Sequence, residues 1–103
     1  MNADENDAYV SEQIRAKLGN TVDVEDIVVK GDLLQVHVTK PFYERLAADR
    51  ERGRKIMLAL MQQMKTFTGL EDVTARVYCD KDQVIEAKTK KWGGDNVTYR
   101  YDL

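Results

Sequence analysis

The chain has 103 residues, of which 43% are hydrophobic and 33% are charged, and its formal net charge is -2. This balance excludes a disordered segment and predicts one globular domain over residues 1–103. No apolar run is long enough to span a bilayer, and the first residues lack the features of a signal peptide, so we expect a cytoplasmic protein that does not contact a membrane. The single Cys79 excludes an intramolecular disulfide, which suits a reducing compartment.

The charges are distributed unevenly along the chain. Residues 1–32 carry three Lys or Arg against eight Asp or Glu, whereas residues 50–91 carry ten Lys or Arg against six Asp or Glu. An acidic first third and a basic middle would help to orient a partner or a second copy of the chain. A solvated surface of mixed charge explains the same pattern more simply.

Residues 4–20 are predicted to form a helix. Val10, Ile14 and Leu18 recur at helical spacing, and acidic residues crowd the start of the segment, where the helix dipole favours them. Gly19 is a stop signal. The apolar stripe is narrow, so we expect this helix to lie on the rest of the fold and to be partly exposed.

Residues 26–38 are predicted to form a β-hairpin that turns at Gly31 and Asp32, because glycine supplies the positive φ that a tight hairpin needs. A two-residue loop fixes the register and puts four aliphatic side chains on one buried face. The predicted cross-strand pairs are Val29 with Leu34, Ile27 with Val36, and Asp26 with His37.

Residues 42–68 carry a long helical pattern. Its apolar residues fall within one narrow sector, and a methionine-rich stripe at this spacing is typical of a buried core. One straight helix over these residues would be about 40 Å long, which is more than the length of about 20–27 Å expected for the strands. The helix is therefore expected either to extend beyond the sheet or to break, and Gly53 is the residue at which a break is expected. Gly69 ends the helix, and Leu70 is expected to fold back onto Met64. The sector contains Leu46, Gly53, Met57, Leu60, Met64 and Phe67.

Three strands are predicted in the last third of the chain. Residues 72–80 alternate between apolar and polar side chains, and residues 84–92 and 97–102 form the next two strands after turns. The element order is a helix, a β-hairpin, a long helix and a three-stranded antiparallel meander. This order predicts an α+β domain with helices packed on one face of a mostly antiparallel sheet.

No catalytic, cofactor-binding or metal-binding motif can be identified. His37 is the one histidine, and no other group joins it at the spacing of a triad or a metal site. Cys79 lies on the apolar side of its strand, which indicates a buried thiol. Asp80 and Asp82 flank a turn but lack the further acids and the glycine of a calcium loop. We therefore expect no enzymatic activity, no metal and no cofactor.

One group of aromatic and basic residues shares a predicted sheet face. A two- or four-residue loop at residues 93–96 places Lys90 opposite Tyr99 and Lys88 opposite Tyr101. The rings would stack on the bases of a single-stranded nucleic acid while the cations contact its phosphates, although pairs of lysine and tyrosine are also ordinary on solvated sheets. The predicted ligand-binding face contains Arg76, Tyr78, Lys88, Lys90, Trp92, Tyr99 and Tyr101.

The sequence favours a small non-enzymatic protein-interaction module, and self-association as a homo-dimer is its simplest form. Leu58 points away from the apolar sector of its helix and has basic neighbours in Arg54 and Lys55, so these three residues are the predicted partner contact. The alternative is a protein that binds single-stranded nucleic acid or another anionic ligand through the predicted face. The acidic first third of the chain opposes binding of a polyanion.

Overall fold

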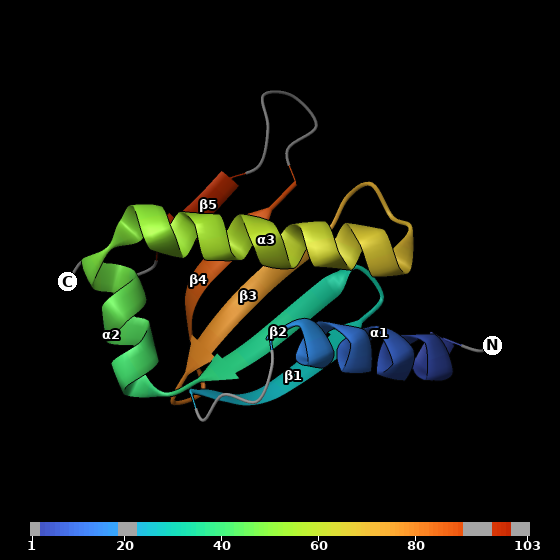
Figure 1. Ribbon diagram of the computed structural model, residues 1–103, viewed down its shortest axis with the longest axis horizontal. Helices are drawn as coiled ribbons and strands as arrows, with labels where there is room; N and C mark the ends of the chain where they lie inside the picture. The colour runs from blue at the N-terminus through green and yellow to red at the C-terminus, as the bar shows by residue number, and fades with distance from the viewer. Residues whose placement is uncertain (1–2, 19–22, 90–95, 100–103) are drawn as a thin grey trace.

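The computed structural model of the chain describes residues 3–18, 23–89 and 96–99. In chain order, the elements are α1 (Ala3–Leu18), β1 (Val24–Lys30), β2 (Leu33–Val38), α2 (Lys40–Ala48), α3 (Arg50–Thr68), β3 (Thr74–Cys79), β4 (Asp82–Lys88) and β5 (Asn96–Tyr99). Within the described ranges, the chain forms three helices and a five-stranded sheet, with α1 and α3 across one face of the sheet and α2 at the start of α3 (Figure 1), which confirms the predicted α+β class.

The five strands form one mixed sheet in the order β1-β2-β3-β4-β5. Neighbouring strands are antiparallel except β2 and β3, which are parallel because α2 and α3 form the crossover between them. The hairpin and the three later strands therefore join into a single sheet rather than forming a separate meander. The turn between β3 and β4 is made by Asp80 and Lys81, both with positive φ, as in the tight hairpin turns of type I′.

The predicted register of the first hairpin is confirmed. The pairs Val29 with Leu34, Ile27 with Val36, and Asp26 with His37 all occur between β1 and β2. The four aliphatic side chains are buried, and Gly31 has a φ of 61° in the turn. The glycine in the turn and the alternation of apolar and polar side chains along the two strands both predict this register, so the local sequence was sufficient to define it.

The predicted long helix is two helices, and the break lies at Asp49 rather than at Gly53. Asp49 ends α2 with a non-helical backbone, and its carboxylate accepts a hydrogen bond of 3.1 Å from the N–H of Arg52, which caps α3. Aspartate is favoured here because its short side chain satisfies a free N–H in the first helical turn. The break lets α2 turn away from the axis of α3 (Figure 1).

The core lies between the helical layer and the sheet. Met57, Leu60 and Met64 of α3 are exposed by 0%, 5% and 0%, which confirms the prediction that the methionine stripe is buried. Val10 and Ile14 of α1 are also fully buried, and α1 packs against β1 and α3. No helix in the described ranges is long and apolar enough to cross a membrane.

Gly69 ends α3 in the left-handed conformation, as predicted, with a φ of 74°. The prediction that Leu70 folds back onto Met64 was wrong, because Leu70 is 43% exposed. Hydrogen bonds of the Thr68 side chain, and not an apolar contact of Leu70, are found at this end of α3. The hydroxyl of Thr68 donates to the carbonyl of Met64 at 2.6 Å and accepts from the N–H of Leu70 at 3.1 Å. The hydroxyl of Thr68 thus gives the N–H of Leu70, which lies beyond the end of α3, a hydrogen-bond acceptor.

Candidate interaction surfaces

Among the described residues, no helix covers the second face of the sheet, which we call the open face. Alternate residues of each strand point to it, because successive side chains of a strand lie on opposite sides of the sheet. The open face thus carries both cations and carboxylates, with polar and a few apolar side chains between them. Its residues are Asp26, Val28, Lys30, Leu33, Gln35, His37, Thr74, Arg76, Tyr78, Gln83, Glu86, Lys88, Asn96 and Thr98.

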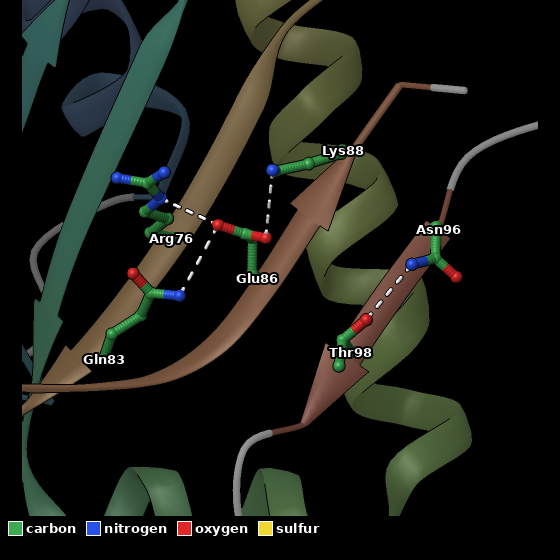
Figure 2. A network of polar contacts seen from close by, with 6 residues as sticks. All are labelled: Arg76, Gln83, Glu86, Lys88, Asn96 and Thr98. Atoms are coloured by element: carbon green, nitrogen blue, oxygen red, sulfur yellow. Dashed lines mark hydrogen bonds and ion pairs between the residues drawn. The ribbon is translucent and has the colours of Figure 1, made fainter. Parts of the chain in front are cut away.

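Glu86 is the centre of a polar network on the open face. Its carboxylate accepts a hydrogen bond of 2.9 Å from Nε of Arg76 and lies 3.5 Å from Nζ of Lys88, and Gln83 donates to it at 3.5 Å (Figure 2). The hydrogen bond with Glu86 raises the pKa of Arg76. Two of the predicted cations therefore share one carboxylate, which weakens the attraction of this part of the sheet for phosphate groups.

A second cluster adjoins this network on the open face, because Tyr78 pairs with Gln83 across β3 and β4. The rings of His37 and Tyr78 are stacked with centroids 5.1 Å apart. They border a shallow groove of about 360 Å³. Acidic residues and one lysine surround the rings, so the groove has no single sign of charge. Its lining is Glu25, Asp26, His37, Val38, Tyr78, Asp80 and Lys81. In the part of the chain that the structure describes, no group of three His, Cys, Asp or Glu side chains is placed to hold a metal.

Cys79 is buried at the end of β3, as its position in the strand predicted. Burial raises the pKa of its thiol above the usual value, because the charged thiolate loses water there. A raised pKa and a covered sulfur are the opposite of what a nucleophilic cysteine needs. Cys79 therefore acts as a small core side chain.

The predicted register between the last two strands was wrong. Tyr99 pairs with Ile85, and Lys88 pairs with Asn96. The observed register differs from the predicted one by an odd number of residues, so Tyr99 moves to the helix side of the sheet.

Arg76, Tyr78 and Lys88 do share the open face, but the predicted aromatic and basic group is not assembled as expected, because Tyr99 points the other way. The remaining members of that group lie outside the described residues. They are Lys90, Trp92 and Tyr101.

Tyr99 joins β5 to the junction of α2 and α3. Its hydroxyl lies 3.4 Å from the carbonyl oxygen of Leu46 and 3.2 Å from that of Arg50, and the guanidinium of Arg50 lies over its ring at 5.0 Å. One hydroxyl has one proton, so the two carbonyl groups share it. Burial raises the pKa of Tyr99. The end of β5 is thus held by the helical layer.

Gly53 makes room for this contact, and its role was missed in the sequence. It lies inside α3 facing Tyr99, and a Cβ atom at this position would overlap the Tyr99 hydroxyl. A glycine inside a strong helical pattern costs stability and indicates a close approach by another group. That signal was present in the sequence, although it does not reveal which residue makes the approach.

Leu58 and Arg54 lie on the side of α3 that faces β5. Arg50, Arg54 and Leu58 are spaced four residues apart and form one slanted row, which starts at the guanidinium over Tyr99. The opposite side of α3 faces α1, where Ile56 and other residues line an apolar groove of about 220 Å³. In Figure 1, α1 and β5 appear on opposite sides of α3.

Leu58 is half-buried and packs against the core, whereas Arg54 and Lys55 are exposed. We use the name β5 flank for the surface along this side of the molecule. It consists of Arg50, Arg54, Lys55 and Leu58 of α3 together with Val97 and Tyr99 of β5.

Comparison with family models, curated proteins and solved structures found no match to this chain.

Proposed function

We propose that this protein is a small non-enzymatic protein-interaction module that self-associates through the β5 flank. The observation that supports the proposal is the position of Leu58. It is an apolar side chain beyond the buried sector of α3, only half covered by the core and flanked by the exposed cations Arg54 and Lys55. Contact with another chain would remove its remaining apolar surface from water.

The neighbouring side chains of the β5 flank suit contact with a protein. Val97 is half-buried on the helical side of β5 and, like Leu58, packs against the core, so each of the two residues leaves part of an apolar side chain uncovered. The aliphatic stems of Arg54 and Lys55 can cover apolar area while their charged ends stay in water. A second copy is the simplest partner, because two-fold dimers are the commonest assemblies.

A cytoplasmic location is part of the proposal. Cys79 is a free, buried thiol, and a free thiol suits a reducing compartment, which supports this location.

The proposal is tested by measuring the mass of the protein in solution by light scattering and sedimentation over a wide concentration range. We expect a concentration-dependent dimer that Arg54→Glu and Leu58→Ser weaken. Ile56→Ser is the matched control, because Ile56 is also half-buried in α3 but faces the α1 side. Arg54 is exposed, so Arg54→Glu separates loss of contact from loss of folding. A monomer at the highest concentration reached would refute self-association.

A further inference from the structure

The two edges of the sheet differ in how their backbone groups are satisfied. On the edge strand β1, the carbonyl of Ile27 accepts a hydrogen bond of 3.2 Å from the hydroxyl of Ser11 in α1, and the N–H of Ile27 donates to the carboxylate of Asp26 at 2.9 Å. Asp7 of α1 accepts a further bond of 3.0 Å from the N–H of Gly31. The β1 edge is therefore covered at Ile27 and at the turn that follows the strand, by groups of α1 and by the side chain of Asp26.

The β5 edge has no such protection among the described residues. β5 is the last strand of the sheet, and no described group makes a hydrogen bond with the outer side of its backbone. The strand is four residues long, and all four are uncharged. Proteins that keep an edge strand from pairing make it very short, or place lysine, proline or a bulge there. β5 is short, but residues 96–99 contain no lysine, proline or bulge.

β5 is also held in place before any partner arrives. The Tyr99 hydroxyl lies within hydrogen-bond distance of carbonyl groups of Leu46 and Arg50, so the strand end is fixed to the junction between α2 and α3. A strand that is already ordered loses less conformational entropy when another strand pairs with it. The free edge is therefore preorganised for strand addition.

We propose that β5 of a second copy pairs antiparallel with β5, so that the two sheets join into one; this inference rests on the proposed self-association. A two-fold axis perpendicular to the sheet places the strand beside itself in antiparallel orientation and keeps both helical layers on one side. Val97 and Tyr99 point to the helical side, whereas Asn96 and Thr98 point to the open face. The pairing must therefore be centred on a residue, either Val97 or Thr98.

Both registers bring uncharged open-face residues together. In one, Thr98 lies opposite Thr98 of the second copy, and in the other, Asn96 lies opposite Thr98. Neither register creates a like-charge contact, and Thr and Asn side chains can exchange hydrogen bonds across the strands. The surface is thus compatible with a copy of itself, whereas the paired and bonded β1 edge is not available for the same contact.

Charge reversal at the exposed residues of β5 tests this pairing. We would prepare Asn96→Lys with Thr98→Lys, and separately Asn96→Glu with Thr98→Glu, and compare both with Val28→Lys on the open face of β1. Either double variant alone should dimerise at least tenfold more weakly, because like charges face each other in both registers. An equimolar mixture should recover a heterodimer, and Val28→Lys should dimerise like the wild type.

The outcomes separate this inference from the proposed function. A wild-type dimer that neither double variant weakens would overturn the β5 pairing and leave self-association through α3 standing. Loss of the dimer in both folded variants without recovery on mixing would also overturn the pairing. A wild type that stays monomeric would overturn both proposals. Circular dichroism and thermal unfolding would verify that the variants are folded.

Discussion

The contact between Gly53 and Tyr99 gives a sharp test of the structure, through the substitution Gly53→Ala. On helix propensity alone, alanine inside α3 should stabilise the protein by about 0.5–1 kcal/mol. The structure opposes this gain. The new methyl group would overlap the Tyr99 hydroxyl, and it would stand 3.1 Å from the carbonyl oxygen of Leu46 and 3.2 Å from Cζ of the ring.

The opposing costs are larger than the gain. The tyrosine ring is rigid, so it must move as a unit, and its hydroxyl then leaves the carbonyl groups of Leu46 and Arg50. A lost hydrogen bond costs about 0.5–1.5 kcal/mol, and overpacking a well-filled site typically costs about 1–3 kcal/mol. We therefore expect Gly53→Ala to lower the free energy of unfolding by about 1–3 kcal/mol.

Urea denaturation of four proteins measures this balance as a double-mutant cycle. The proteins are the wild type, Gly53→Ala, Tyr99→Ala and the double variant. Once the ring is absent, Gly53→Ala should become close to neutral or stabilising, because the overlap with the ring is gone and only the 3.1 Å contact with the carbonyl oxygen of Leu46 opposes the gain in helix propensity. A stabilising Gly53→Ala in the wild-type background would show that Tyr99 does not occupy this place, and the assigned side of β5 would then be wrong.

Four other outcomes are expected. Leu60→Ala should lower the free energy of unfolding in urea by about 2–5 kcal/mol, because the side chain is 5% exposed and its removal leaves a cavity; a change below 1 kcal/mol would contradict its place in the core. Cys79 should react slowly with a thiol reagent at neutral pH and rapidly in denaturant, because the folded protein covers the sulfur and raises its pKa; equal rates would refute this. Because the folded pKa of Tyr99 lies above its usual 10.0, stability should be lost as the pH rises from there through the raised value. Thermal unfolding between neutral and strongly alkaline pH should show a smaller loss in Tyr99→Phe. A labelled single-stranded oligonucleotide should not bind at physiological salt, since Arg76 and Lys88 both contact Glu86; binding that Arg76→Ala removes would contradict this.

Local chemistry was sufficient to predict several parts of the fold. The hairpin of β1 and β2 follows from alternating side chains and a glycine in its turn, which are both properties of adjacent residues. The burial of Met57, Leu60 and Met64 follows from helical periodicity, since one face of a helix must cover a sheet. The left-handed end of α3 at Gly69 has the same local origin.

The break between α2 and α3 shows where competing local signals mislead. Gly53 is the weaker helix former, but Asp49 can both end one helix and cap the next. Gly53 lies inside α3, and Tyr99, distant in the sequence, occupies the space that a side chain at this position would need. Periodicity alone could not weigh a cap against a contact with a residue from another element.

The candidate interaction surfaces depended most on tertiary structure. The sequence identified Leu58 as an apolar residue outside the buried sector, and it identified Arg76 and Lys88 as neighbours on one face. It could not identify the side of β5 on which Tyr99 lies, because that depends on the length of a connection whose residues do not determine a unique turn. A shift by an odd number of residues moves every side chain of a strand to the other face. The sequence by itself therefore determined the order of helical and strand segments and the buried faces of α3 and of the first four strands, whereas tertiary packing decided the register of the last strand and with it which residues remain available to a partner.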